Sequence, residues 1–311
     1  MVSTDKEVGI SVVIPVYNEE GVLPELYRRL TRTMKDIGQT YEIVFVDDGS
    51  KDRSFEILKT LKEQDEHLKI IKLTRNFGQH PAIMAGFNNC VGEAVVLMDA
   101  DLQNPPEEIP KLLEKFREGY DIVYGVRERR KDPLYRRIGS RMAKWLVRKV
   151  LKVDIPDSLT AFRVMSGRVL DTLTQMKEQQ YYIGALMAWM GYSSATVPVR
   201  HAERFAGRSH YSMHKLIFMT IDMLIGFSYA PLKWASKTGF VLASISLLYG
   251  LYILIRALTG DVGVPGYASI FVGMMFLSGI QMMFLGVIGE YLARIYREAK
   301  GRPYYVIDDI I

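Results

Sequence analysis

Two aspartates, Asp99 and Asp101, are separated by a single alanine and follow directly after a short apolar run, residues 94–98. A short, continuous apolar run is typical of a buried strand in a parallel sheet. Pro105 and Pro106 then predict the end of this strand segment and the start of a helix, whose first turn is acidic. The aspartates are therefore expected at the carboxyl end of a strand, where open α/β sheets bind their ligands.

The spacing of Asp99 and Asp101 predicts a site for a divalent metal. Residues two apart in a strand point to the same face, so these carboxylates would repel each other unless a cation lay between them. Carboxylate oxygens suit Mg²⁺ or Mn²⁺, and such ions usually bridge a substrate's phosphates. A solvated Asp-x-Asp turn is the alternative, and the two residues alone leave both interpretations open.

Alternating strands and helices bring further polar residues to the same place. Strands are expected to begin at residues 10, 41, 69 and 94, with helices after each of them. This order predicts βαβ units and a doubly wound α/β sheet over about the first 125 residues. Three of these strands run into acidic residues, which are Glu19, Asp47 with Asp48, and Asp99 with Asp101. Parallel strands would gather these ends at one edge of the sheet and form a crevice there.

The composition limits the class of protein. The chain has 311 residues, a net charge of +5 and a single cysteine, Cys90. One cysteine excludes an internal disulfide framework and fits a reducing compartment. Residues 1–9 are polar and charged, unlike a secretory signal peptide.

Two apolar stretches, about residues 239–258 and 267–289, predict a transmembrane hairpin within residues 233–292. The first has no charge until Arg256 and the second has none, and each can span about 30 Å of hydrocarbon. Because a short loop joins them, both flanks lie on one side of the membrane. The flanks are basic, which places that side and the tail, residues 293–311, in the cytoplasm. The flanking basic residues are Lys233, Lys237, Arg294, Arg297, Lys300 and Arg302.

Basic residues also gather before the hairpin. A basic amphipathic helix with Trp145 is expected over about residues 135–152, lying on an anionic membrane surface. An ordinary solvated helix face is the alternative. The apolar segment 212–232 is expected to be a juxtamembrane or interfacial helix. Because the basic helix precedes membrane segments, the charge pattern argues against nucleic-acid binding.

Three motifs resemble the signature of family 2 glycosyltransferases with a GT-A fold. They are Ile-Pro-Val-Tyr-Asn-Glu-Glu at residues 14–20, Val-Asp-Asp-Gly-Ser at 46–50 and Asp-Ala-Asp-Leu-Gln at 99–103. The resemblance implies a GT-A (Rossmann-like) catalytic domain over residues 1–211, ahead of the hairpin.

Further motifs narrow the resemblance to polyprenyl-phosphate glycosyltransferases. They are Arg-Asn-Phe-Gly at residues 75–78, Asp-Leu-Gln-Asn-Pro-Pro-Glu at 101–107 and Gly-Val-Ile-Gly-Glu-Tyr at 286–291. That group includes bactoprenol glucosyltransferases, undecaprenyl-phosphate aminoarabinose transferases and dolichol-phosphate mannose synthases. The resemblance covers nearly the whole chain.

The resemblance implies transfer of a sugar from a UDP-sugar to polyprenyl (undecaprenyl) phosphate, with inversion and with Mg²⁺ or Mn²⁺. It implies an integral protein of the inner membrane, with its catalytic domain cytoplasmic and with a homotetrameric assembly. One alternative is a processive polysaccharide synthase, which usually needs more spans and a Gln-x-x-Arg-Trp motif. The other is a non-catalytic membrane scaffold, which the presence of both Asp99 and Asp101 disfavours.

The resemblance also implies roles for single residues. Asp47 would take the uracil edge, Asp99 the ribose or the metal, and Asp101 the metal against the diphosphate. The residues implied to hold the nucleoside are Pro15, Tyr17, Glu19, Asp47 and Asp99. The candidate contacts for the sugar or the acceptor phosphate are Gln103, Arg127, Arg163, Arg204, Arg208 and Ser209.

Asp157 is the second catalytic candidate. The bactoprenol glucosyltransferases would carry their acid at the position of Ala161, whereas this sequence has Asp157 six residues before Arg163, as the aminoarabinose and mannose enzymes do. This departure argues against a glucose donor. The family analogy makes Asp157 a general base, but a phosphate monoester is mostly dianionic at pH 7 because its second pKa is about 6. Orientation of the acceptor is therefore the alternative role.

Residues 204–212 resemble the Arg-x-x-Gly-x-Ser-Lys-Tyr loop that contacts donor or acceptor phosphate in the family. His210 stands where that loop has lysine, so Arg208 is expected to supply part of the positive charge. A loop that meets a lipid phosphate is well served by arginines, because their guanidinium groups bind phosphate through two hydrogen bonds.

Overall fold

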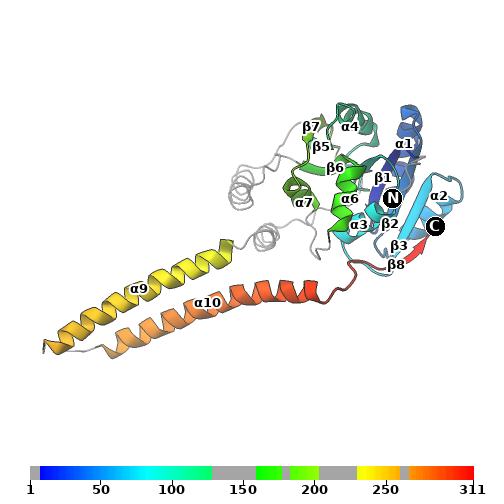
Figure 1. Cartoon of the computed structure of the whole chain (residues 1–311). Coiled ribbons are helices and arrows are strands. Elements are labelled where there is room, and N and C mark those ends of the chain that lie inside the picture. The colour runs from blue at the N-terminus through cyan, green and yellow to red at the C-terminus, as the bar shows by residue number, and fades with distance from the viewer. Residues whose placement is uncertain (1–7, 128–158, 177–182, 203–229, 260–265) are drawn as a thin grey trace. The chain divides into compact units, whose positions relative to one another are not determined.

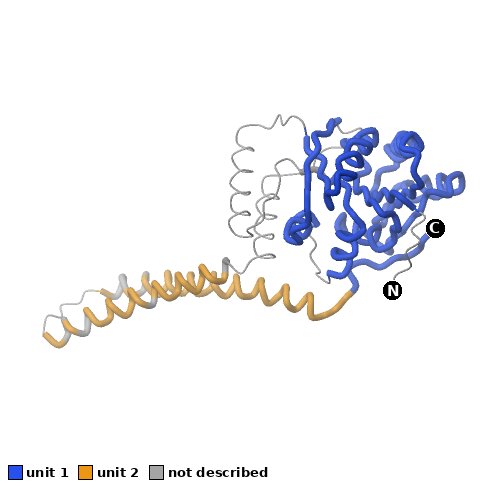
Figure 2. Tube along the Cα trace, turned by 45° about the horizontal axis from the view of Figure 1, so that its top comes forward, with its two compact units in different colours: residues 1–144, 153–211, 303–311 blue, residues 145–152, 212–302 orange. Residues whose placement is uncertain are grey.

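The computed structural model describes residues 8–127, 159–176, 183–202, 230–259 and 266–311 (Figure 1). These residues fall into two compact units, coloured separately in Figure 2. The first unit takes the described residues within 1–144, 153–211 and 303–311, and the second takes those within 145–152 and 212–302.

In the described part of the first unit, a mixed sheet has the strand order β7-β5-β6-β4-β1-β2-β3-β8. Its strands are β1 (Ile10–Val16), β2 (Tyr41–Asp47), β3 (Leu68–Leu73), β4 (Ala94–Leu97), β5 (Ile122–Arg127), β6 (Leu159–Ser166), β7 (Ser194–Val199) and β8 (Ile307–Ile310). The strands β1 to β4 are parallel, as the alternating pattern predicts, whereas β6 and β8 run antiparallel to their neighbours. The α/β fold class is therefore confirmed.

Helices connect the strands of this sheet. They are α1 (Leu23–Ile37), α2 (Ser54–Lys62), α3 (Gln79–Asn89), α4 (Ile109–Phe116), α6 (Gly167–Gln175) and α7 (Ile183–Trp189), with a 3₁₀ turn at Pro106–Glu108 before α4. The apolar side chains of α1 recur at helical spacing and are buried, and α1 ends at Gly38, whose positive φ allows a left-handed cap. Every residue of β2 is buried, as in a strand covered on both faces.

The packing of α3 on β1 depends on Gly86. A Cβ at this position would lie 2.4 Å from Cγ1 of Val13 in β1. Only glycine lets the helix approach so closely. This contact fixes α3, and α3 begins at Gln79, beside the carboxyl ends of the strands.

The second unit holds two long helices, α9 (Ala230–Leu258) and α10 (Tyr267–Ala299), in yellow and orange to red in Figure 1. Both are longer than the apolar stretches that predict them. Many of their large apolar side chains are exposed, for example Phe240 and Leu247. Within the described residues, one segment, Gly273–Ala299, is long and apolar enough to cross a membrane.

Two predicted helices fall outside the description. The basic helix at 135–152 lies outside the described residues, as does the juxtamembrane segment 212–232 up to the start of α9 at Ala230. The tail, in contrast, contains a strand that the sequence analysis did not anticipate. Residues 303–311 belong to the first unit, and β8 pairs with β3.

Candidate active site at the carboxyl edge of the sheet

The carboxyl ends of β1, β2 and β4 meet at one edge of the sheet. Val16 at the end of β1 pairs with Asp47 at the end of β2. On the other side of β1, Val13 pairs with Leu97, the last residue of β4. The strand order thus brings Asp47 and the segment that contains Asp99 to the two sides of β1.

Asp99 and Asp101 lie beyond the strand, so the expectation that strand alternation directs both to one face is wrong. β4 ends before Asp99, and Asp101 lies in a turn. Asp99 accepts a hydrogen bond from Nε2 of Gln79 at 2.7 Å. The carboxylate of Asp101, a buried residue, accepts one from the backbone N–H of Gln103 at 3.1 Å. The next residue, Leu102, has a φ of 58°, a conformation that L-residues rarely adopt.

The donor atoms of this turn fit a hard divalent cation. Mg²⁺ is commonly held by one or two carboxylates together with substrate phosphates, rather than by a complete protein cage. The described residues contain no group of three or more His, Cys, Asp or Glu side chains that could hold a metal. A cation at Asp99 and Asp101 would therefore take further oxygen ligands from a substrate diphosphate or from water.

Asp47 lies buried at the end of β2. Both carboxylate oxygens accept from the backbone N–H of Ser50, at 3.3 and 3.4 Å. Burial raises the pKa of Asp47, while the hydrogen bonds from Ser50 and the charge of Lys72 oppose that rise. Asp47 is therefore a carboxylate held at the sheet edge, with its long hydrogen bonds leaving acceptor capacity for a ligand.

Asp48 binds a second loop, a role that the sequence analysis missed. Its two carboxylate oxygens accept from the backbone N–H groups of Phe77, at 2.7 Å, and Gly78, at 2.9 Å. Gly49 follows with a φ of 65°, and a Cβ there would lie 2.5 Å from the carbonyl carbon of Arg75. The loop after β2 and the Arg-Asn-Phe-Gly loop after β3 are therefore in direct contact.

The charge of Asp48 carries a cost in stability. Burial raises its pKa from 3.8 to about 6, against the opposing effect of the Phe77 and Gly78 N–H groups. Because the folded chain then binds more protons than the unfolded chain between these values, the unfolding free energy falls as pH rises from about 4 to 6.

We expect Asp48→Asn to remove this pH dependence. The neutral amide has no charge to desolvate, so the variant should gain stability relative to the wild type as pH rises from about 4 to 7. Unfolding midpoints of both chains, measured side by side across that range, test the expectation. A difference between the two midpoints that stays constant with pH would contradict it.

The nucleoside candidates after β1 are tied to the loop after β2. The backbone N–H of Asn18 donates to Oγ of Ser50 at 3.0 Å, and that of Glu19 to Oγ of Ser54 at 2.8 Å. Pro15 is half-buried in β1, and Tyr17 is exposed. The structure thus brings Tyr17 and Glu19 close to the segment that carries Asp47.

Arg163 is a buried cation on β6. Nε donates to the carbonyl of Ala161 at 3.0 Å, and Nη1 lies 3.4 Å from Sδ of Met187. The guanidinium lies 5.7 Å from the centre of the Tyr124 ring. Burial lowers the pKa of Arg163, and the charge of Asp99 opposes that effect. Arg163 is the register partner of Leu97, two residues before Asp99. A guanidinium has five N–H donors, so these partners leave capacity for an anion.

His201 joins the site although the sequence analysis did not single it out. Burial lowers its pKa, as does the charge of Arg127 at the end of β5, whereas Asp101 raises it. The next residue, Ala202, donates its N–H to the carbonyl of Gln103 at 2.9 Å. The segment that leads to the predicted phosphate loop is therefore attached to the Asp101 turn.

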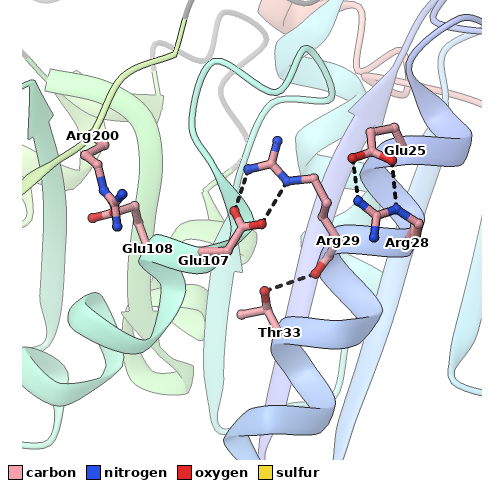
Figure 3. Close-up of polar contacts among 7 residues, drawn as sticks. All are labelled: Glu25, Arg28, Arg29, Thr33, Glu107, Glu108 and Arg200. Carbon is pink, nitrogen blue, oxygen red and sulfur yellow. Dashed lines mark hydrogen bonds and ion pairs between the residues drawn. The ribbon is translucent and has the colours of Figure 1, made fainter.

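Two glutamates hold the other end of this turn, as Figure 3 shows. Glu107 accepts two hydrogen bonds from Arg29 of α1, at 2.8 and 2.6 Å. Glu108 is buried and accepts from Nε of Arg200 at 2.8 Å and from Nζ of Lys111 at 2.6 Å. Charge-assisted hydrogen bonds, and the bidentate pair of Arg29 and Glu107 in particular, fix the orientation of the groups that they join. The segment after Asp101 is thereby fixed between α1 and the end of β7.

The remaining candidates lie outside the described residues. They are Asp157, Arg204, Arg208 and Ser209.

Comparison with known proteins agrees with this arrangement. Residues 11–174 match the profile of glycosyl transferase family 2. An uncharacterized glycosyltransferase of Bacillus subtilis (strain 168) is 40% identical over 97% of this chain and 94% of its own length. The undecaprenyl-phosphate 4-deoxy-4-formamido-L-arabinose transferase of Shewanella sediminis (strain HAW-EB3) is 40% identical over 97% of this chain and 92% of its own length.

Among solved structures, glucosyl-3-phosphoglycerate synthase from Mycobacterium tuberculosis, in complex with Mn²⁺, UDP and glucosyl-3-phosphoglycerate, has a TM-score of 0.51. It is 18% identical and covers 70% of this chain and 78% of its own. This likeness shows a shared fold and confirms the GT-A fold that the motifs predict. The family match over residues 11–174 and the relatives that are 40% identical over 97% of the chain show that this chain is a glycosyltransferase and belongs to glycosyl transferase family 2.

Proposed function

We propose that this chain transfers a sugar from a UDP-sugar to a polyprenyl phosphate, undecaprenyl phosphate in particular, with inversion at the anomeric carbon. The product is a polyprenyl-phospho-sugar for cell-envelope glycan or lipid A modification. Relatives with 38% to 40% identity over 97% of the chain are named undecaprenyl-phosphate transferases, which supports this acceptor.

The observation that carries the proposal is that carboxylates and a buried arginine come to the same edge of the sheet. Asp47, Asp99 and Asp101 supply carboxylates for a nucleoside and a metal, while the buried Arg163, the register partner of Leu97 at the end of β4, offers N–H donors at the same edge. A reaction between a nucleotide-sugar and a phosphate needs both kinds of group. A buried arginine is stable only with compensation, and a phosphate supplies it.

Asp47 and Tyr17 bind the nucleoside in this proposal. Asp47 accepts from the uracil N–H with its remaining acceptor capacity, because its hydrogen bonds to Ser50 are long. The exposed ring of Tyr17 offers a surface on which the base stacks. Glu19 and Pro15 shape the turn around the ribose.

Asp99 and Asp101 would hold Mg²⁺ or Mn²⁺. When bound, the cation neutralises charge on the diphosphate that leaves. Asp99 also has Gln79 as a hydrogen-bond partner, so α3 orients this ligand. Gln103, two residues after Asp101 and joined to its carboxylate through the backbone N–H, would contact the sugar.

The chemical step forms a bond between an acceptor phosphate oxygen and the anomeric carbon and breaks the bond from that carbon to the diphosphate. The electron pair leaves with UDP. Because the acceptor is mostly dianionic at pH 7, no proton has to be removed from it. Arg163, with Arg127, Arg204, Arg208 and Ser209, binds the acceptor phosphate in line with the breaking bond. Asp157 orients the acceptor or takes a sugar hydroxyl.

We further propose that the chain is an integral protein of the inner membrane. The basic flanks of the hairpin support a catalytic unit on the cytoplasmic side. The apolar segment Gly273–Ala299 supports an attachment of this kind. A homotetramer is the assembly that family analogy proposes.

Mass spectrometry of lipid products tests the function. Membranes that contain the chain receive a panel of UDP-sugars with undecaprenyl phosphate, and membranes with Asp101→Ala serve as the matched control. We expect one sugar added to one lipid phosphate, dependent on Asp101. Polymer on the lipid would favour a processive synthase instead. No product with any donor, in a folded chain, would contradict the proposal and favour the scaffold.

A further inference from the structure

We infer that the C-terminal segment, residues 303–311, positions the donor site, with Asp308 holding Lys72 beside Asp47. This inference rests on the proposed function in one respect, which is that Asp47 binds the nucleoside of the donor. The contacts themselves are independent of the donor's identity.

Backbone hydrogen bonds attach the segment to the edge of the sheet. Ile70 and Ile311 exchange two of them, each 2.9 Å long, and the N–H of Thr74 donates to the carbonyl of Val306 at 3.1 Å. Near them, Nδ2 of Asn88 in α3 donates to the hydroxyl of Tyr305 at 3.0 Å. An uncovered edge strand is prone to fray or to pair with another chain, so β8 keeps β3 in place.

A register shift in this pairing directs Asp308 toward Lys72. Lys72 pairs with Asp309, whereas Leu73 pairs with Ile307, so Asp308 is the extra residue of a bulge. Bulges bend a strand and redirect side chains, often next to active sites. In this bulge, Oδ2 of Asp308 lies 2.7 Å from Nζ of Lys72.

Lys72 connects the bulge to the donor site. In the parallel pair of β2 and β3, Lys72 is the register partner of Asp47. Its charge opposes the rise that burial causes in the pKa of Asp47. Lys72 also lies 4.9 Å from the centre of the Phe55 ring, a contact that fixes the ammonium from α2. The ammonium is therefore held by Asp308 and Phe55 on the residue that pairs in register with Asp47, the carboxylate proposed to bind uracil.

The same strand leads into the loop that Asp48 binds. β3 ends at Leu73, and residues 75–78 follow at once, with the N–H groups of Phe77 and Gly78 donating to Asp48. A shift of β3 would therefore move both Lys72 and this loop. In the sequence, residues 300–306 connect the end of α10 to the start of β8.

The ion pair between Lys72 and Asp308 is expected to position Lys72 and to add little to folding stability. The side chains of Lys72 and Asp308 are 35% and 47% exposed. Ion pairs with this much solvent exposure contribute little to folding stability. Loss of Asp308 should therefore change the donor site without lowering the unfolding temperature noticeably.

The point variant Asp308→Ala, made in the full chain in detergent, is compared with Asp309→Ala. Asp309 is the matched control because it is the next residue on the same strand and the register partner of Lys72, yet it acts on Lys72 only through its charge, while its carboxylate accepts from the adjacent N–H of Ile310. We expect Asp308→Ala to weaken UDP binding about 2- to 5-fold in calorimetry, with Asp309→Ala close to the wild type. Equal affinities in all three chains would overturn the role of Asp308.

Truncation after Arg302 tests the whole segment. The shortened chain should lose at least about 10-fold in UDP affinity, because β3 becomes an exposed edge. A synthetic peptide of residues 303–311 in large excess should restore binding. The same peptide with Ile311→Pro should not, because it lacks the N–H that donates to Ile70. Unchanged UDP affinity in the truncated chain would overturn the inference.

Hydrogen exchange separates this inference from the proposed function. The amides of residues 75–78 should exchange faster in Asp308→Ala and faster still in the truncated chain, with or without UDP. If the intact chain binds no UDP, the proposed donor is wrong, yet faster exchange still supports the positioning role. Unchanged exchange at residues 75–78 in the truncated chain refutes that role whatever the donor.

Discussion

Asp101→Ala should nearly abolish sugar transfer, with kcat/KM reduced by about 10³-fold. A carboxylate that holds a cation against a leaving diphosphate stabilises charge that develops in the transition state, and loss of one such group typically costs about 10²- to 10³-fold. Asp101 is also buried in the turn that Gln103, Glu107 and Glu108 hold, so water does not easily replace its oxygens.

The variant Asp101→Asn distinguishes the effect of the negative charge from the effect of the hydrogen bond that holds the turn. The amide oxygen can still accept from the N–H of Gln103, so the turn should persist and the unfolding temperature should stay close to that of the wild type. Transfer should fall as far as in Asp101→Ala, because the negative charge is gone. EDTA should stop the wild type, and added Mg²⁺ or Mn²⁺ should restore it. Full activity in EDTA, or in Asp101→Asn, would refute the metal role.

Arg163→Met should lower transfer by about 10²-fold or more while leaving the fold as stable as before, or more stable. The two effects have one cause, which is burial of a guanidinium whose hydrogen bonds go to the carbonyl of Ala161 and the thioether of Met187. Burying a charged group costs free energy of desolvation, and an apolar side chain of similar volume removes that cost. The acceptor phosphate, in contrast, loses its charge-assisted hydrogen bonds.

Arg163→Lys serves as the matched control. Lysine keeps the charge but lacks the planar pair of N–H donors, so we expect intermediate activity and a raised KM for the acceptor. Unfolding temperature and kcat/KM, with the donor saturating, are measured for the three chains. An Arg163→Met chain that is unstable yet transfers sugar normally when folded would show that Arg163 is a structural residue, and the proposed phosphate contact would be wrong.

The sequence by itself determines the parallel part of the sheet, β1 to β4, and the chemistry of its edge. Apolar runs followed by acidic residues place carboxylates at the ends of β1, β2 and β4, because the parallel direction of successive strands follows from alternation with helices. The two apolar stretches likewise predict α9 and α10 from composition and length alone. Both predictions use local sequence patterns only, because side chains that point to the same face recur with the period of the helix or strand.

Only the tertiary structure decides how the edge is assembled. The direction of Asp99 and Asp101 depends on a turn with Leu102 in a left-handed conformation, which strand periodicity does not encode. Asp48 meets Phe77 and Gly78 because β2 and β3 are neighbours, and Lys72 meets Asp308 from 236 positions away. Such contacts depend on which strands lie side by side. The strand β8 has four residues, two of which are aspartates, so its own sequence does not predict a strand. It forms because it pairs with the edge strand β3.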